Sequence, residues 1–355
     1  FKGTSKSIQN EILQCMLEVC QAEITKEIKD AEFLAVIADE TSDVASIFQM
    51  VIIYRYLVNG KPVERFWNFV RPSGHDAESL TTAIMSELDP HLEGCPNKLI
   101  AQTYDGASVM GGTKRGVQAI MKEKYPAASY IHCHAHQLNL IMLNAASVNT
   151  NVRIFFANLQ GICTFFSNSP QRTAVLDEVV QKRLPRSVPT RWNFHSRTVN
   201  TIYEHREDLI ECMEVIQRRH HSSNNTTVQA SGFKGTLKDK DFIYWLSFFH
   251  KIMPHVDILY NHLQKRDCNP PLVLAQVNAF EREVQKVRNT VDCEEQQEPA
   301  AKRKRTVCQT AKRREAFEVC DNILREAKDR GHLVAASLFH SEKFSDYVYV
   351  KNFPE

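Results

Sequence analysis

The amino-acid sequence predicts an α/β protein in which a mixed five-stranded sheet with flanking helices is followed by an all-helical region. Runs rich in β-branched and aromatic residues occur early in the chain, at 33–38, 48–58, 63–70, 98–104 and 128–133. After about residue 150 such runs stop, and apolar residues recur at helical spacing instead. This change of period separates a part with a sheet from a part without one.

A helix over residues 8–30 should open the chain. Its apolar side chains are spaced to form one stripe that packs beside the next segment of the chain. They are Ile8, Ile12, Leu13, Met16, Val19 and Ile24. The second and third strands are separated by Asn59-Gly60, and both residues tolerate positive φ. We therefore expect an antiparallel hairpin there.

Helices and strands alternate after this hairpin. Asp76 or Ser79 can cap a helix over 77–89, and further helices are expected over 114–124 and from near Ala135. Three antiparallel strands followed by this alternation build a mixed sheet. A right-handed crossover then makes the first and fourth strands parallel neighbours.

The second half of the chain should contain six helices, divided by prolines and by a polar loop over 220–240. They span 151–168, 171–184, 195–219, 241–264, 271–289 and 312–330. Residues 291–311 place an acidic block beside basic ones and predict a disordered charged linker. We expect domains over 1–150 and 151–290, then this linker, then a helical segment over 312–355.

The composition excludes several classes of protein. No apolar run is long enough for a membrane span, and ten scattered cysteines without a Cys-x-x-Cys pair favour reduced thiols. We expect a soluble, intracellular protein with no membrane partner and no small-molecule substrate. A net charge of +2 means that nucleic acid would bind through local patches. The missing initiator methionine and the uncapped end suggest a piece of a longer protein.

Two apolar runs each end in an aspartate, Asp39 and Asp105. If the first and fourth strands are neighbours, these carboxylates emerge at the same edge of the sheet. Paired carboxylates can hold Mg²⁺ or Mn²⁺ for phosphoryl transfer on nucleic acid. The alternative is that each aspartate caps a turn or helix, as Asp39-Glu40-Thr41-Ser42 and Asp105-Gly106-Ala107-Ser108 would allow.

Two further motifs are candidates for function. Cys133 and His136 are three residues apart and could provide two ligands of a zinc ion, but no second pair follows. Packing at a strand-to-helix joint, or contact with substrate, is the other interpretation. Arg191 and Trp192 place a guanidinium beside an indole, which suits a phosphate next to an unpaired base, or else a buried tryptophan between domains. The run 302–305 fits nuclear import, nucleic-acid binding or a solvated linker.

Four of these segments, in this order, resemble motifs of the hAT superfamily of DNA transposases. Within it the chain is similar to the transposon-derived group of the zinc finger MYM-type proteins and the 52 kDa repressor of the protein kinase inhibitor. The segments are Ala38–Asp43, Tyr104–Met110, Cys133–Leu140 and Thr190–Trp192. The resemblance covers about residues 1–220 and is looser over 241–355.

The resemblance implies a ribonuclease-H-like core interrupted by an all-helical insertion, in a nuclear protein that binds DNA and forms oligomers through a further C-terminal segment. Asp39 and Asp105 would be the first two members of an Asp-Asp-Glu triad for Mg²⁺ or Mn²⁺. Cys133 and His136 would match a Cys-x-x-His element near the active site. Trp192 would match a tryptophan associated with the flipped base or hairpin at the transposon end.

The chain also departs from the family pattern. The glutamate of the triad should come after the insertion, yet Glu315, Glu318 and Glu326 stand in no family motif, and the usual N-terminal zinc finger is absent. We therefore expect that this chain alone does not complete a two-metal site. The candidate functions are a transposase core that cleaves and transfers DNA strands, a domesticated and inactive nuclear interaction module, and, more weakly, a different ribonuclease-H-like nuclease.

Overall fold

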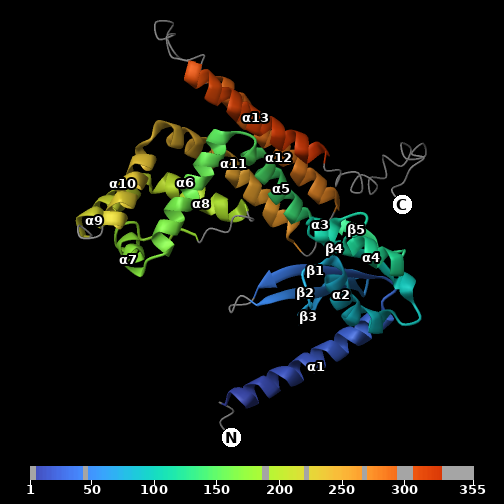
Figure 1. Cartoon of the computed structure of the whole chain (residues 1–355). Helices are drawn as coiled ribbons and strands as arrows, with labels where there is room; N and C mark the ends of the chain where they lie inside the picture. The colour runs from blue at the N-terminus through green and yellow to red at the C-terminus, as the bar shows by residue number, and fades with distance from the viewer. Residues whose placement is uncertain are drawn as a thin grey trace, which may run out of the picture. The chain divides into compact units, whose positions relative to one another are not determined.

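The computed structural model describes residues 5–42, 47–185, 192–219, 224–265, 270–293 and 307–329 (Figure 1). The chain divides into two compact units, Phe1–Gln137 and Leu138–Glu355. The described strands all belong to the first unit, and the described part of the second is helical. The predicted change from a sheet to helices is confirmed, whereas the domain limits expected near 150 and 290 stay predictions.

The sheet has the order β3-β2-β1-β4-β5. β1 pairs antiparallel with β2 and β2 with β3, while β4 is parallel to β1 and to β5. This is the mixed sheet that the sequence predicts. The strands are β1 (Leu34–Ser42), β2 (Phe48–Val58), β3 (Lys61–Val70), β4 (Leu99–Tyr104) and β5 (Ser129–His132).

The hairpin between β2 and β3 turns at Asn59 and Gly60, whose φ angles are 52° and 73°. Both angles are positive, as the predicted tight turn requires. The pairing of β2 with β3 is irregular at one place, because Ile52 pairs with Asn68 and Ile53 with Phe66. Trp67 is therefore an extra residue in β3, a β-bulge that changes which side chains share a face.

One face of the sheet, the core face, is buried under helices α1 (Lys6–Asp30), α2 (Ala77–Leu92) and α4 (Val117–Lys124). Their buried side chains form one cluster with alternate residues of β1 and β2. The cluster includes Ile24, Ile28, Val36, Ala38, Ile52, Tyr54, Leu80, Ile84, Leu88, Val117 and Met121. Asp76 caps α2 by accepting from the Ser79 backbone N–H, as predicted. Two short elements complete this unit, a 3₁₀ turn at Pro96–Lys98 and α3 (Ser108–Gly111).

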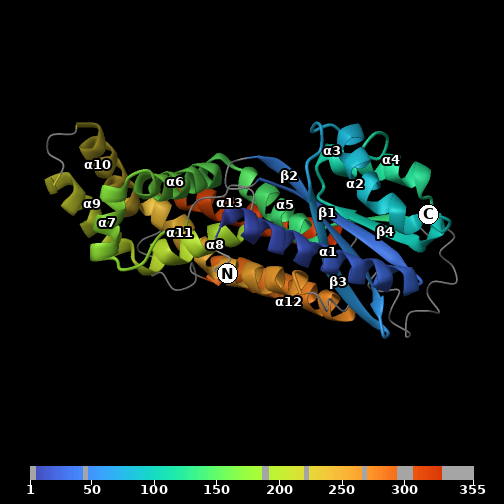
Figure 2. The ribbon, with the colours of Figure 1, turned by 90° about the horizontal axis from the view of Figure 1, so that it is seen from below.

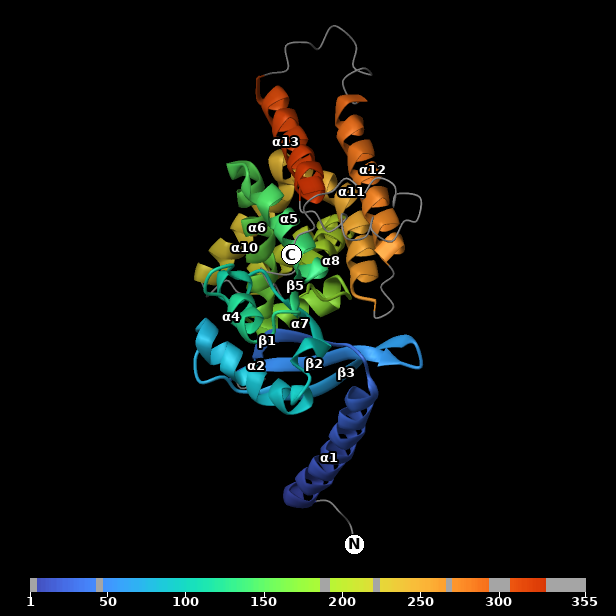
Figure 3. The same ribbon diagram turned by 90° about the vertical axis from the view of Figure 1, so that its right-hand side faces the viewer.

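The first helix packs only with its C-terminal half. Ile24 is buried there, and Glu27 accepts hydrogen bonds from Arg65 at 3.0 Å and from Tyr56 at 2.6 Å. The predicted packing of the N-terminal half is wrong for the described chain, because Leu13 and Val19 are 62% and 71% exposed. Figures 1 and 3 show this half of α1 projecting beyond the sheet.

The described part of the second unit is all helical. The boundary between the units falls within α5 (His134–Ser147). The further helices are α6 (Thr150–Ser167), α7 (Pro170–Val179), α8 (Trp192–Glu204), α9 (Arg206–Arg219), α10 (Asn224–Lys238), α11 (Lys240–Leu263), α12 (Pro270–Cys293) and α13 (Val307–Asp329). Helices α7, α9 and α10 gather at one end of this unit (Figure 2), and α12 packs on α11 and α13 (Figure 3).

Two predictions for this unit are wrong. Most of the polar segment 220–240 is the helix α10, which buries Ala230 and Leu237 at a seven-residue spacing. The single helix expected over 195–219 is divided into α8 and α9. The rest of the expected helices are present with ends shifted by a few residues. Most of the predicted linker 291–311 and all of 330–355 lie outside the described residues.

In the part of the chain that the structure describes, no helix has both the length and the apolar character that crossing a membrane requires.

Candidate active site

Asp39 lies within a strand. β1 continues through Ser42, and Asp39 pairs with Val51 of β2. The expectations that the strand ends before Asp39 and that this aspartate caps a turn are therefore wrong. In a strand neighbouring side chains alternate between the two faces. Val36 and Ala38 lie on the core face, so Asp39 points to the opposite face, where it is exposed.

The pairing of β1 with β4 brings Asp105 beside Asp39. Val36 is opposite Gln102 and Ile37 is opposite Thr103. The recorded pairing ends there; extended by two residues in the same register, it would set Asp39 level with Asp105, which directly follows β4. Paired residues of adjacent strands share a face, and such strands lie about 4.8 Å apart. The two carboxylates therefore emerge from neighbouring strands on one face, although 66 positions separate them in the sequence.

We call this second side of the sheet the acid face. It carries Ala35, Ile37, Asp39, Val51, Ile53, Arg55, Glu64, Phe66, Phe69, Ala101 and Thr103. Most of its apolar side chains stay partly or largely exposed, for example Ile53, Phe66 and Phe69. The acid face therefore differs from the core face both in its charge and in its access to solvent.

The loop after β4 holds Asp105 in place. The Tyr130 hydroxyl donates to the Asp105 carbonyl oxygen at 2.9 Å. The Ala107 N–H donates to Oδ1 of the Asp105 carboxylate at 3.2 Å. Asp105 thus stabilises its own turn, as the alternative interpretation predicted for it, while Oδ2 accepts no hydrogen bond from the described residues.

Gly106 allows this loop to approach β5 closely. The ring of His132 lies where a side chain at position 106 would begin, so any Cβ there would overlap it. The rings of Tyr104, Tyr130 and His132 stack in sequence, with centroids 6.1 and 6.4 Å apart. The turn that carries Asp105 therefore rests on a stack of aromatic rings.

The pKa of Glu40 depends on the charges of Asp105 and Asp39. Partial desolvation and then the negative charge of Asp105 raise the pKa of the Glu40 carboxyl, and Asp39 contributes in the same direction. The nearby His75 opposes this increase. Sequence reasoning missed Glu40 as part of the acidic cluster. The signal was its place directly after Asp39, although strand alternation turns it toward the other face.

Cys133 and His136 lie at the joint between β5 and α5. The Cys133 N–H donates to the Tyr104 carbonyl at 3.1 Å, which extends the pairing of β5 with β4. The His136 ring lies 5.5 Å from the ring of His132, measured between centroids. His132 in turn packs on Gly106, so Cys133 and His136 border the Asp105 loop. Their direct role near an active site stays a prediction.

The other predicted site residues are not described. Arg191 lies outside the described residues, and so does the side chain of Trp192, the first residue of α8. Their contact with DNA stays a prediction. The three glutamates near the end of the chain belong to α13 in the second unit. Within that unit, Glu326 accepts from Asn144 at 3.1 Å and Glu315 from Asn151 at 2.9 Å.

The acidic pair has the donor chemistry for a hard divalent cation. Mg²⁺ is commonly bound by one or two carboxylates, with water and substrate phosphate supplying its other ligands. Asp39 and Asp105 provide two such carboxylates, and both of their charges contribute, after partial desolvation, to the raised pKa of Glu40. Among the described residues, no group of three or more His, Cys, Asp or Glu side chains is arranged to hold a metal ion.

Comparison with known proteins agrees with this fold. Residues 1–116 match the family model described as DUF4371: ZMYM1/FAM200, RNase-like domain. The 52 kDa repressor of the inhibitor of the protein kinase from Homo sapiens is 24% identical over 270 residues, which are 70% of this chain and 35% of that protein. The protein of the same name from Mus musculus is 28% identical over 174 residues, 46% of this chain and 22% of that protein.

The chain therefore spans about a third of the human relative's length. The matched family model ends at residue 116, so it includes β1 to β4 together with Asp39 and Asp105. The sheet topology and this RNase-like model together confirm the expected ribonuclease-H-like fold, and over its first 116 residues the chain is similar to the ZMYM1/FAM200 domain.

Proposed function

We propose that this chain is part of the catalytic core of a hAT-like DNA transposase, which cleaves and transfers DNA strands with a divalent metal in its full-length form. The observation that supports the proposal is the parallel register of β1 and β4, which pairs Ile37 with Thr103, each two residues before one of the aspartates Asp39 and Asp105. Kinship with a transposon-derived group supports it. The protein would act in the nucleus on DNA.

In this proposal each residue has a defined task. The carboxylates of Asp39 and Asp105 would hold Mg²⁺ or Mn²⁺, which would supply neutralisation of the charge that develops on a phosphate during strand cleavage. The Ala107 N–H fixes Oδ1 of Asp105, so that its second oxygen faces a ligand in a constant orientation. The ring stack under Gly106 keeps the loop from moving away from β1.

The test is a DNA nicking assay on the full-length protein that contains this chain, with its own transposon ends and Mg²⁺. Asp39→Asn and Asp105→Asn each remove a ligand charge and should lower the nicking rate roughly a hundredfold or more, because several kcal/mol of charge stabilisation is lost. Glu32→Gln is the matched control. It removes an exposed carboxylate just before β1, at the opposite end of that strand. Equal activity of all four proteins would refute the proposal.

A second candidate is a domesticated interaction module that binds DNA or protein without cleaving. It is favoured by the name of the curated relatives, which are called repressors. In that case Asp39→Asn and Asp105→Asn together leave DNA or partner binding unchanged, and the unmodified full-length protein does not nick DNA with either metal. If the unmodified protein nicks DNA and the two aspartate variants bind DNA without nicking it, the first candidate is supported and the second is excluded.

A further inference from the structure

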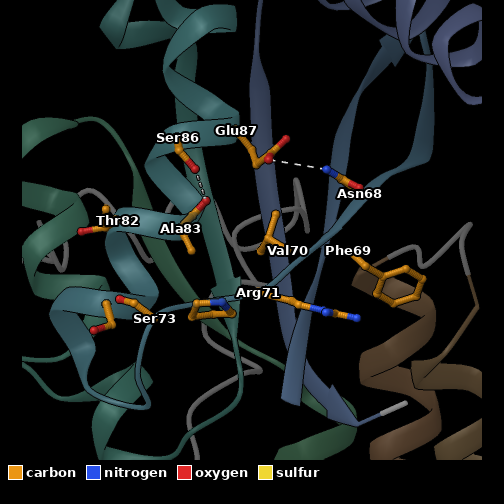
Figure 4. Close-up of a pocket in the computed structure, with 11 residues that line it drawn as sticks. Asn68, Phe69, Val70, Arg71, Ser73, Thr82, Ala83, Ser86 and Glu87 are labelled. Atoms are coloured by element: carbon orange, nitrogen blue, oxygen red, sulfur yellow. Dashed lines mark hydrogen bonds between the residues drawn. The ribbon is translucent and has the colours of Figure 1, made fainter. Parts of the chain in front are cut away.

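A hollow of about 380 Å³ opens at the sheet edge beside β3, entirely within the first unit (Figure 4). Its lining combines a guanidinium, an aromatic ring and a row of hydroxyls from α2 and the loop before it. The lining residues include Phe69, Arg71, Ser73, Thr82 and Ser86. A polar, open hollow of this kind suits an extended chain better than an enclosed small molecule, whose pockets are mostly apolar.

Phe69 and Arg71 lie on the acid face. Phe69 pairs with Val51, which pairs with Asp39, so these three residues form one row across β3, β2 and β1. Arg71 follows Phe69 by two residues, and the intervening Val70 is buried on the core face. Figure 4 shows the Phe69 and Arg71 side chains extending to one side, away from Ser86 and Glu87 of α2. Two strand spacings, about 10 Å, separate Asp39 from Phe69.

The β-bulge creates this arrangement. Phe66 and Phe69 are three residues apart and would point to opposite faces of a regular strand. The extra residue Trp67 brings both to the acid face, where their ring centroids are 5.0 Å apart. The two rings are 46% and 51% exposed. Trp67 itself turns to the core face and donates to Glu87 at 2.7 Å.

The charges on this part of the face are unequal. Arg55 is paired with Glu64 at 2.6 Å, so its charge is already balanced. Arg71 has no ion pair or hydrogen bond with any residue in the described part of the chain. An unpaired guanidinium two residues from an exposed aromatic pair is the combination that binds a phosphate while a base stacks alongside.

We propose that Phe69 and Arg71 bind a single DNA strand that runs from the acidic pair across β2 to the edge strand β3. One base stacks on Phe69, and the phosphate next to it binds Arg71. This inference rests on the proposed function, since it assigns the acid face to DNA, but it concerns binding and not cleavage.

The experiment measures the affinity of the 355-residue chain for a short fluorescein-labelled single-stranded DNA by anisotropy, without a divalent metal. Phe69→Leu keeps an apolar side chain but removes the stacking platform and should weaken binding about tenfold. Arg71→Gln should weaken it similarly and reduce the slope of log affinity against log salt by about 0.7, the value for one phosphate contact on a single strand. Phe69→Leu should leave that slope unchanged.

Matched controls come from the other end of the same sheet. Phe33→Leu replaces a phenylalanine that is 44% exposed just before β1, and Lys61→Gln removes an exposed positive charge beside the hairpin turn. Both should bind DNA like the unmodified chain. If the unmodified chain does not bind, or if the four variants bind alike, the inference is refuted. The same holds if Phe69→Leu and Arg71→Gln lower the urea midpoint without changing affinity, because the face then packs against protein.

These outcomes are independent of the nicking assay. A chain that binds DNA through Phe69 and Arg71 but never nicks refutes the catalytic proposal and supports this inference. The reverse outcome is a full-length protein that nicks DNA through Asp39 and Asp105, while Phe69→Leu and Arg71→Gln bind DNA normally. It supports the catalytic proposal and refutes this inference.

Discussion

The two faces of the same sheet differ in packing and in exposure. On the core face, alternate residues such as Val36, Ile52 and Tyr54 have no exposed surface and pack under three helices. On the acid face, their direct neighbours Ile37 and Ile53 stay partly exposed, and charged or aromatic side chains surround them. One strand thus packs the core with one set of side chains and presents the other set, partly exposed, on the acid face. Because side chains alternate between the two faces along a strand, a mutation can change one face and leave the other intact.

The largest expected effect compares Ile52 with Ile53, adjacent residues of one type on opposite faces of β2. Ile52→Ala should cost about 2–5 kcal/mol, because it removes a fully buried side chain and leaves a cavity. Ile53→Ala should cost about 1 kcal/mol, since a partly exposed side chain loses less on truncation. The measurement is the free energy of opening from hydrogen exchange of the β2 amides. Equal costs would mean that the two faces are packed alike.

A smaller loss is expected when the loop of Asp105 is pushed off its support. Gly106→Ala places a Cβ inside the His132 ring, so the loop or the ring must shift, at about 1–3 kcal/mol. The same shift moves Asp105 away from Asp39 and should lower nicking by the full-length protein. Gly232→Ala, in α10 with open space around it, is the control and should be neutral or stabilise by up to about 1 kcal/mol. Normal nicking by Gly106→Ala would show that the close contact does not position Asp105.

Local signals were enough to predict much of the sheet. The hairpin is predicted by Asn59-Gly60, and β2 was predicted with its observed ends because the run before this turn is continuous. The end of β1 was missed because Glu40 and Thr41 look like a turn, whereas pairing with β2 keeps them extended. The polar composition of 220–240 likewise predicted a loop where α10 is found. This helix packs through a few buried side chains and has no long apolar stripe.

The site was predictable only as far as topology determines it. Asp39 and Asp105 lie on neighbouring strands because a crossover makes β4 the parallel partner of β1, and that is a consequence of the order of elements. The positions of Phe69 and Arg71 depend on a β-bulge at Trp67. No residue type in β3 predicts this bulge. The support of Gly106 by His132 is a packing relation between distant residues. Such features become visible only with the register of the strands.

The smallest expected effect is a change in the pKa of Glu40. Strand alternation turns Glu40 toward the core face, yet its pKa depends on the charges of Asp39 and Asp105. Its raised pKa means that the folded state binds a proton more tightly than the unfolded state. The stability linked to Glu40 is therefore greatest below the unfolded pKa and is lost as the pH rises through the higher folded pKa. Asp105→Asn removes a repelling charge and should lower the Glu40 pKa, and Asp39→Asn should lower it less.

His75→Gln should raise the Glu40 pKa, because it removes a group that lowers this pKa. The measurement is an NMR titration of the Glu40 side-chain carboxyl in the unmodified chain and the three variants. A cation held by the acidic pair acts like the removal of repulsion, so adding Mg²⁺ should lower the Glu40 pKa in the unmodified chain and have little effect in Asp105→Asn. If all four titrations coincide, the three carboxyl groups do not share one electrostatic site, and the register argument for a common cation fails with them.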